Sequence, residues 1–264
     1  MIQAVQNQHD RRVKILGVKL TDVTVRRAVD IVEEMIGDDS RETRSIYFVN
    51  AHTLNLAQAD PEYRDVLNSA DHVFGDGTGV RWGARLQGVR VRDTLVRTDL
   101  VPSMFRITSG CGYSYYLLGS DQATIEKASR YARANFGGWQ QAGFHHGYLT
   151  DDELTAAAIE QINAAEPDVL LVGMGNPLQE RWIARHRDRL RVPVVMGIGG
   201  LFDYWADNVS RAPLWLRKAG HEWLWRLYQQ PRDKAHRYLI GNPLYLFHIM
   251  REQWESRSRG GKPA

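Results

Sequence analysis

The fold is decided by residues 168–197, which read DVLLVGMGNPLQERWIARHRDRLRVPVVMG. The stretch opens with an apolar run that we predict as a strand over 168–173. A glycine-containing loop then leads into a helix predicted over 178–188, and a second apolar run predicts a strand over 193–198. A strand, a helix and another strand in this order are typical of a parallel sheet that helices cover.

The same alternation extends to both sides of this unit. We predict further strands over 13–18, 45–49, 71–74, 114–119 and 142–146, and further helices over 24–37, 52–59, 62–69, 78–87, 98–107, 121–136 and 151–164. The pattern predicts an α/β fold with a Rossmann-like, mostly parallel sheet and helices on both faces. We assign this α/β body to residues 1–204.

After about residue 204 the strand pattern stops, and the sequence predicts an all-helical appendage over 205–264. Its helices are expected over 212–229, 231–239 and 243–255, separated by prolines and by the GNP at 241–243. From residue 211 onward the chain holds 11 Lys+Arg against 4 Asp+Glu, which leaves 23 against 27 for the remainder. Five of the eight tryptophans also lie at or beyond residue 205, so the appendage is both basic and aromatic.

The composition indicates a protein of the reducing cytoplasm. With 264 residues, 43% of them hydrophobic, the chain can bury a large core. Cys111 is the only cysteine, which excludes an internal disulfide. The N-terminal stretch has no apolar centre like that of a secretory signal, and no apolar run approaches the roughly 20 residues of a membrane-spanning helix. We therefore expect a soluble protein made in the cytoplasm.

Four loops that follow predicted strands carry most of the glycines and polar residues of the body. They are VNAH from residue 49, GDGTG from 75, GMGNPLQE from 173 and GIGGLFD from 197, and a fifth, LLGSDQ, is weaker. Because the carboxyl ends of parallel strands share one edge of a sheet, these loops are expected to border one ligand crevice.

Several common site motifs are missing. GDGTGVRWG differs from the dinucleotide fingerprint in its spacing, and its acid would repel a pyrophosphate. The sequence contains no phosphate-binding GxxxxGK[ST] loop, no GxSxG and no HExxH. His145 and His146 are neighbours on a predicted strand, so they point to opposite faces and cannot chelate one ion. An Asp-x-Asp that could hold a divalent cation is also missing, and we expect neither a metal nor a cofactor.

Asp76 stands between Gly75 and Gly77, just after a predicted strand. Flanking glycines permit unusual backbone angles and let another molecule approach closely, so the carboxylate is expected to point into the crevice. Aspartate is also common as a cap of the helix that follows it. On the residues alone, both interpretations stay open.

Four blocks of the sequence together resemble the WecG/TagA/CpsF family, glycosyltransferase family 26, in collinear order from about residue 12 to 250. They read DPEYRDVLNSADHVFGDGTGVRWGARLQG, RTDL, GMGNPLQERWI and GIGGLFDYWADNVSRAPLWLRKAGHEWLWRLYQQPRDKAHRY. The resemblance implies a metal-independent, inverting transfer of a sugar from a nucleotide diphosphate to a lipid-diphosphate-linked sugar at the cytoplasmic face of the membrane. The donor is expected to be UDP-linked, and the acceptor a polyprenyl-diphosphate saccharide of a cell-surface polysaccharide pathway.

The resemblance also assigns roles to single residues. Asp76 corresponds to the family's general base, and Asn50 and Gln179 would hydrogen-bond the donor sugar or the acceptor. Asn50 can instead be a helix cap, and Gln179 a solvated residue of a first helical turn. Asp203 would help to hold the nucleotide or serve as a buried cap, and Asp99 would serve the pocket or cap the helix predicted near it.

Without a metal, the leaving diphosphate needs arginine guanidinium groups, and the family's appendage supplies them. Together, the loops and the resemblance give the expected substrate contacts: Gly77, Thr78, Gly79, Thr98, Asp99, Gly119, Gly173, Gly175, Asn176, Glu180, Gly199, Gly200, Asp203, Arg211, Arg226, Arg232 and Arg237.

The appendage has a second expected role. Interleaved aromatic and basic residues on short helices suit an anionic membrane surface, which would make the protein peripheral on the inner face of the cell membrane. Packing of aromatics onto the body is the simpler alternative, but it does not explain the excess charge. Two other functions stay open: a non-catalytic nucleotide-binding protein, and a nucleic-acid-binding protein, although the chain has no recognisable nucleic-acid motif. Whether the protein forms a homo-oligomer also stays open.

The chain departs from the family pattern at three places. Phe48 stands where the family often has threonine, two residues before Asn50. In the block that the family often writes ERxxGTD, this chain has Thr94 and Arg97 in the places of the arginine and the glycine. These departures bear on donor and acceptor contacts and not on the reaction class.

Overall fold

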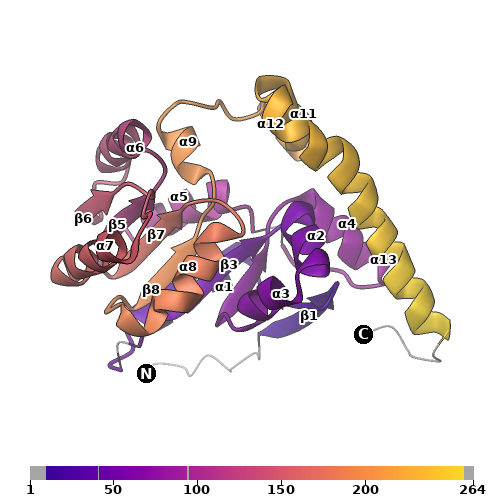
Figure 1. The fold of residues 1–264 in the computed structure, drawn as a ribbon, viewed down its shortest axis with the longest axis horizontal. Helices are drawn as coiled ribbons and strands as arrows, with labels where there is room; N and C mark the ends of the chain where they lie inside the picture. Colours follow the sequence, from indigo (N-terminus) through magenta and orange to yellow (C-terminus); the bar gives the residue numbers. More distant parts are fainter. Residues whose placement is uncertain (1–9, 41, 94, 259–264) are drawn as a thin grey trace, which may run out of the picture.

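The computed structural model describes residues 10–40, 42–93 and 95–258, so Thr94 lies outside the described residues. A six-stranded, all-parallel sheet forms the centre of the molecule, in the order β4-β3-β8-β7-β5-β6 (Figure 1). Its strands are β3 (Arg44–Val49), β4 (His72–Gly75), β5 (Ser114–Gly119), β6 (Gln140–His145), β7 (Val169–Gly173) and β8 (Val194–Gly197). The expected α/β fold is confirmed.

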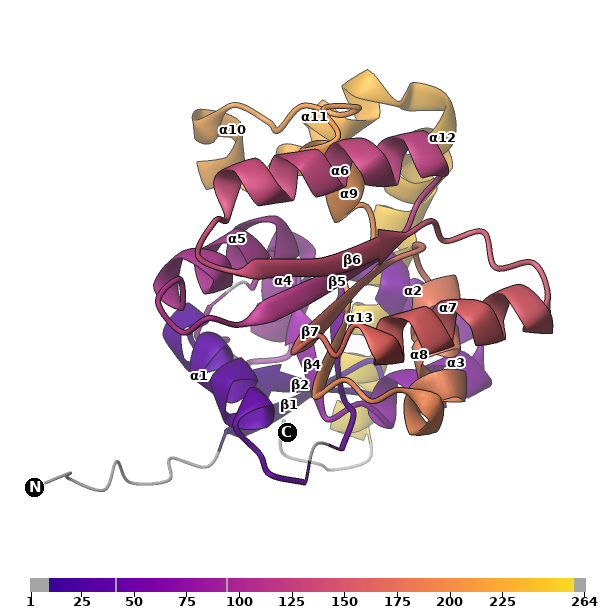
Figure 2. The ribbon, with the colours of Figure 1, turned by 90° about the vertical axis from the view of Figure 1, so that its left-hand side faces the viewer.

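Helices cover both faces of the sheet (Figure 2). They are α1 (Val25–Ile36), α2 (Ala51–Ala59), α3 (Pro61–Asn68), α4 (Thr78–Leu86), α5 (Arg97–Ile107), α6 (Gln122–Asn135), α7 (Asp152–Ala164) and α8 (Leu178–His186), followed by a 3-10 turn η1 (Arg187–Arg189). All eight correspond to predicted helices. The five-residue helix α9 (Leu201–Trp205) was not predicted.

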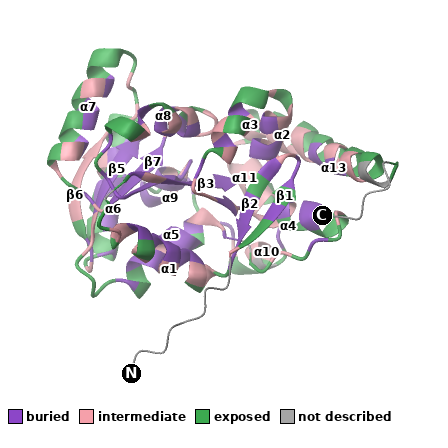
Figure 3. Cartoon of the chain, turned by 90° about the horizontal axis from the view of Figure 1, so that it is seen from below, coloured by how far each residue is buried: buried purple, intermediate pink, exposed green. Residues whose placement is uncertain are grey.

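Side-chain alternation along the central strands explains why the sequence shows continuous apolar runs. In β3, Tyr47 and Val49 join one core cluster and Ile46 and Phe48 join the other, because successive side chains of a strand point to opposite faces. Since both faces are covered, all four side chains are buried, as Figure 3 shows for the central strands, whereas the edge strand β6 is only partly buried. Phe48 is thus a core residue that packs edge-on against Phe74.

The predicted strand over 13–18 is wrong. The segment forms an antiparallel hairpin of β1 (Arg11–Ile15) and β2 (Val18–Asp22), which lies beside β4 and outside the parallel sheet. Leu16 and Gly17 close it with φ angles of 48° and 79°. Two consecutive positive φ angles define the tight turn that joins hairpin strands, and the single glycine gave too weak a signal for it.

The described part of the appendage is helical, but its breaks differ from those expected. Its elements are α10 (Leu214–Lys218), α11 (Glu222–Gln229), α12 (Pro231–Ala235), the π-helical turn η2 (His236–Ile240) and α13 (Gly241–Ser258). Gly220, with φ 78°, divides the helix that we expected over 212–229. The expected break at 241–243 is wrong, because the amide of Gly241 bonds to the carbonyl of His236 and the helix continues.

Helix α13 packs closely on the body, along α2 and α4 (Figure 1). Its Tyr245 and Ile249 are buried within a core cluster of the body. Asn55 of α2 donates a 2.6 Å hydrogen bond to the carbonyl of Gly241, and Thr78 of α4 donates one of 3.0 Å to the carbonyl of Gly220. The carboxyl-terminal helices are therefore anchored next to the loops that follow β3 and β4.

Candidate active site

Three neighbouring strands bring the central loops of the candidate site together. Strands β4, β3 and β8 are adjacent and parallel, so the residues that follow them meet at one edge of the sheet. Asp76 follows β4, Asn50 follows β3 and Gly199 follows β8. The loop after β7, with Gly175 and Asn176, lies one strand further along the same edge.

Asp76 is buried, with only 8% of its surface exposed, and it does not cap its helix. Gly77, with φ 91°, is the N-terminal cap of α4 and makes no side-chain cap bond. The Asp76 amide donates a 2.7 Å bond to the carbonyl of Val49, which ties the loop to the end of β3. Its carboxylate forms an ion pair with Arg97. The alternative that Asp76 only caps α4 is wrong.

The charge state of Asp76 reflects two opposing effects. Burial raises the pKa of the carboxyl group, and the positive charges of Arg97 and Arg237 oppose that increase, while Asp99 adds to it. The net result is a pKa above the ordinary value for aspartate. A carboxylate with a raised pKa is a stronger proton acceptor than one in water, which suits a general base.

Arg97 was not among the predicted site residues. The signal that could have identified it is that an arginine stands here where the family pattern has a glycine. It is the first residue of α5, and its side chain is only 14% exposed. Its guanidinium group lies within 3.1 to 3.3 Å of the position that a Cβ of Gly199 would take. Arg97 therefore fills the space between the β4 and β8 loops.

Asn50 serves as a helix cap and also contacts the appendage. Its Oδ1 accepts bonds from the amides of His52 (3.0 Å) and Thr53 (3.2 Å), so the cap interpretation is confirmed. The same oxygen accepts a 3.3 Å bond from Nη2 of Arg237 on η2. Burial and the nearby cations of Arg237 and Lys234 lower the pKa of His52 to about 4, so His52 is neutral at pH 7.

Gln179 and Glu180 lie at the start of α8 and are both buried. Oε1 of Gln179 accepts a 2.8 Å bond from the Gly199 amide, and its Nε2 donates one of 2.6 Å to Oε1 of Glu180. Glu180 also accepts bonds from Asn176 (2.5 Å) and from the Tyr63 hydroxyl (3.0 Å). The alternative of a solvated Gln179 is wrong, because its amide joins the loops that follow β7 and β8.

The four predicted arginines lie in four different environments. Arg226 stacks over Tyr204, with its Cζ 4.8 Å from the ring centre, and lies close to Gly200. Its Nη1 is buried without a hydrogen-bond partner among the described residues. Arg237 contacts Asn50, as above. Arg211 is already paired with Asp99, so Asp99 does not cap α5 as one alternative held. Arg232 is exposed.

The predicted glycines differ in how much free space surrounds them. Gly77 and Gly175 have no heavy atom within 4 Å of a Cβ position, so a ligand can approach both. Other glycines allow close packing within the protein. A Cβ on Gly119 would meet the backbone of Gly173, and a Cβ on Gly173 would meet the ring of Phe202. Asp203 lies in the first turn of α9, where burial raises its pKa against the opposing charge of Arg226.

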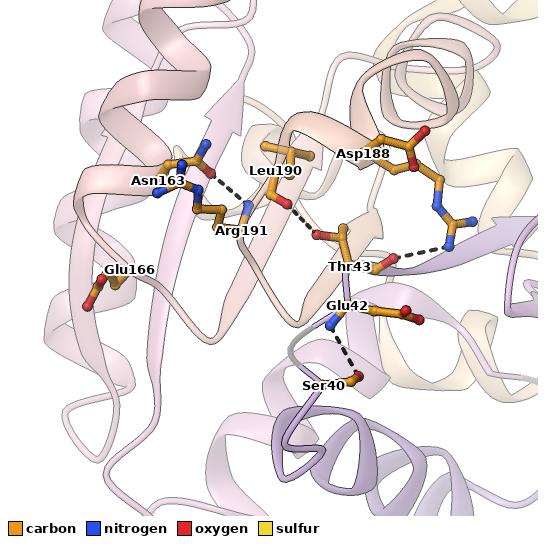
Figure 4. Close-up of a pocket in the computed structure, with 9 residues that line it drawn as sticks. Ser40, Glu42, Thr43, Asn163, Glu166, Asp188, Leu190 and Arg191 are labelled. Carbon is orange, nitrogen blue, oxygen red and sulfur yellow. Dashed lines mark hydrogen bonds between the residues drawn. The ribbon is translucent and has the colours of Figure 1, made fainter.

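A hollow of about 660 Å³ lies at the other edge of the sheet, near the amino ends of β3, β7 and β8 (Figure 4). Hydrogen bonds already tie its loops together, including those from Thr43 to the carbonyl of Leu190 (2.8 Å) and from the amide of Arg191 to Asn163 (2.8 Å). It contains none of the predicted site residues. In residues 10–40, 42–93 and 95–258 there is no cluster of three metal-ligating His, Cys, Asp or Glu side chains.

A parallel sheet with a buried carboxylate, a capping asparagine and several arginines at its carboxyl edge defines an α/β protein that can bind an anionic ligand beside a proton acceptor. The chain belongs to the Glycosyl transferase WecG/TagA/CpsF family, which it matches over residues 13–259. It is therefore a glycosyltransferase.

Two relatives from Staphylococcus aureus show the degree of similarity. The N-acetylglucosaminyldiphosphoundecaprenol N-acetyl-beta-D-mannosaminyltransferase of strain NCTC 8325 is 27% identical over 226 residues, which span 84% of this chain and 86% of the relative. The protein of that name from strain MRSA252 is also 27% identical over 226 residues.

Proposed function

We propose that this protein transfers a sugar, with inversion and without a metal, from a UDP-sugar to a polyprenyl-diphosphate-linked saccharide in cell-surface polysaccharide synthesis. Membership in the family supports the transfer reaction and disfavours both non-catalytic alternatives. The names of the relatives support an acceptor that carries a lipid diphosphate. The observation that carries the proposal is the buried Asp76 carboxylate among arginines at the carboxyl edge of the sheet.

In the proposed reaction Asp76 acts as the general base. Its carboxylate accepts the proton of an acceptor hydroxyl while that oxygen forms a bond to the anomeric carbon of the donor. The bond between the anomeric carbon and the diphosphate oxygen breaks at the same time, and its electron pair leaves with UDP. A single displacement of this kind inverts the anomeric configuration, and a well-placed base contributes roughly 100- to 10,000-fold to such a step.

The departing diphosphate carries the negative charge that develops in this step. Arg226 and Arg237 come from the appendage to the same edge of the sheet, and the buried Nη1 of Arg226 and Nε of Arg237 have no hydrogen-bond partner among the described residues. Burial lowers the pKa of Arg237, an effect that a bound anion would offset. We propose that these two guanidinium groups bind the diphosphate, as a metal ion would in other transferases.

Gln179 takes a positioning role in this proposal. Its amide is occupied by Gly199 and Glu180, so it holds the loops in place, and the donor sugar is left to Asn50 and to the open backbone at Gly77 and Gly175. We further propose that residues 1–204 form the catalytic body and residues 205–264 an appendage that completes the site, which the approach of Arg226 and Arg237 to the same edge of the sheet supports.

We also propose that the appendage docks the protein on the inner face of the cell membrane. Phe247 and Trp254 are 54% and 76% exposed on α13, and helical periodicity puts both on the side opposite the buried Tyr245, while Leu244, 42% exposed, lies at the margin of that side. Arg251 lies on the same side, with half of its side chain exposed. Exposed apolar and basic residues on one side of a helix suit the headgroup region of an anionic bilayer. No described helix is both long and apolar enough to span a bilayer.

Nucleotide release provides the test of the reaction. The purified protein is incubated with single UDP-sugars and a short-chain lipid-diphosphate saccharide, with and without EDTA, and UDP and the glycosylated lipid are quantified. The proposal predicts stoichiometric UDP and product with one donor, an inverted anomer by NMR, and the same rate in EDTA. Retention of configuration, or activity that EDTA abolishes and a divalent cation restores, would overturn the corresponding part.

A further inference from the structure

The backbone segments that carry Asp76 and Arg97 are bound to each other. The amide of Leu95, two residues before Arg97, donates a 3.0 Å bond to the carbonyl of Gly75, and the amide of Asp76 bonds to Val49. Both side chains of the ion pair are largely buried, with 10% of Asp76 and 14% of Arg97 exposed. The two charged groups are therefore held together before any ligand binds.

The other side of the Arg97 guanidinium rests on the loop that follows β8. It packs against Gly199, whose φ of 55° suits glycine and whose amide is held by Gln179. Gln179 is in turn held by Glu180. A chain of contacts thus runs from the buried Glu180 through Gln179, Gly199 and Arg97 to Asp76.

We propose that Arg97 is a positioning residue for the transfer reaction: it fixes the Asp76 carboxylate through Oδ2 and leaves Oδ1 to accept the proton of the acceptor hydroxyl. This inference rests on the proposed function of Asp76. Among the described residues, Arg97 is the hydrogen-bond donor to Oδ2, and no hydrogen bond reaches Oδ1. The glycine of the family pattern has no side chain, so the role belongs to this chain's own departure from the pattern.

Arg97 also controls the charge of Asp76. The charged groups that face this carboxyl are Arg97 and Asp99 of α5, Arg237 of η2, and Glu222 of α11. Burial raises the pKa of Asp76, and Arg97 is the strongest of the opposing influences. Loss of the guanidinium would raise that pKa further, so the ionised base would form only at higher pH.

The test compares Arg97→Gln and Arg97→Lys with Arg106→Gln, which removes an exposed arginine from the same helix. We expect Arg97→Gln to lower kcat by about 100-fold, because misplaced catalytic groups cost that much, with a donor KM close to the original. The acidic limb of the kcat/KM profile should move to higher pH. Arg97→Lys keeps the charge but lacks the planar guanidinium that packs on Gly199, so it should keep the acidic limb and still lose kcat. Arg106→Gln should match the original protein.

An unchanged kcat and an unchanged acidic limb in Arg97→Gln would overturn the proposal. A rise in the donor KM alone would also overturn it, because Arg97 would then be a diphosphate contact. If Arg97→Gln does not fold, Arg97→Lys decides, since wild-type kcat in that variant would show that the packed guanidinium is not needed and would overturn the proposal. Asp76→Asn distinguishes a failure of the proposed function from a failure of the role of Arg97. Turnover in that variant contradicts the proposed function. An inactive Asp76→Asn together with a wild-type-like Arg97→Gln contradicts only the role of Arg97.

Discussion

Arg211 and Asp99 form a two-point ion pair, with Nη1 2.7 Å from Oδ1 and Nη2 3.1 Å from Oδ2. Nη1 also donates a 3.2 Å bond to the carbonyl of Thr98. The pair joins the segment between α9 and α10 to the first turn of α5. It therefore connects the start of the appendage with the helix that carries Arg97.

We predict that Arg211→Gln loosens the appendage without unfolding the protein. Asp99 is more than half exposed, so solvent screens the pair and its loss should cost under about 1 kcal/mol of global stability. Hydrogen exchange of α10 and α11 should nevertheless accelerate. Arg251→Gln, which breaks an exposed pair within α13, is the control. Equal exchange in both variants would show that the Arg211 pair does not hold the appendage.

Gly83 should be essential for the docking of α13. A Cβ at this position would overlap the phenol of Tyr245, so Gly83→Ala forces either helix to shift. We expect a loss of about 1 to 3 kcal/mol in the free energy of unfolding, the usual cost of overpacking, measured by urea denaturation. Gly110→Ala is the matched control, because its Cβ would meet no atom within 4 Å. Equal stability of the two variants would contradict the close packing.

Tyr245→Phe, at the same contact, should not lower the free energy of unfolding. The Tyr245 hydroxyl is buried without a hydrogen-bond partner among the described residues, so its removal should not destabilise the fold. We expect a free energy of unfolding equal to or higher than that of the original protein. A loss above about 1 kcal/mol would mean that the hydroxyl has a partner.

Glu180 should make stability depend on pH. Burial raises its pKa to about 7 from the ordinary 4.5, so the folded state binds a proton more tightly than the unfolded state. The stabilisation is complete below about pH 4.5 and is lost as the pH rises towards 7, with a size of roughly 3 kcal/mol. Glu180→Gln should lack this component. Parallel stability curves for the two proteins between pH 4.5 and 7 would exclude it.

Membrane docking should depend on the exposed side of α13. Phe247→Ser and Trp254→Ser each remove an exposed aromatic, and burial of such a side chain is worth about 1.5 to 3 kcal/mol. We expect each to weaken binding to phosphatidylglycerol vesicles at least tenfold in a flotation assay. Tyr148→Ser removes an aromatic that is 64% exposed on the body and should bind normally. Equal binding of all three variants would place docking elsewhere.

Much of the fold could be predicted because the central strands are buried on both faces. In the sequence they therefore stand out as apolar runs, separated by helical segments that contain many polar residues. The hairpin at 11–22 was missed because a single glycine, Gly17, reverses the chain inside a short run that also fits one strand. The continuous helix through Pro243 was missed because proline usually ends or kinks a helix, whereas here a π-helical turn directly precedes it and the helix continues.

The site was predictable only in part, for a physical reason. Asp76 and Asn50 follow directly from strand ends, and adjacency of those strands brings them together. Arg237 was expected only from the family resemblance and Arg97 was not expected, because both reach this place from distant helices in directions that depend on tertiary packing. The buried role of Gln179 likewise depends on a loop twenty residues later, at Gly199. Sequence patterns locate a residue on an element, but they do not show which distant group its side chain meets.

Turnover of Asp76→Asn tests the role of Asp76 as the base, with Asp65→Asn, which changes an exposed aspartate on α3, as the control. UDP release and UDP binding are measured for both variants with the donor and acceptor that the original protein uses. We predict that Asp76→Asn still binds UDP but loses at least 100-fold in kcat, while Asp65→Asn behaves like the original protein. Turnover of Asp76→Asn within a few-fold of the original would contradict the role of Asp76 as the base.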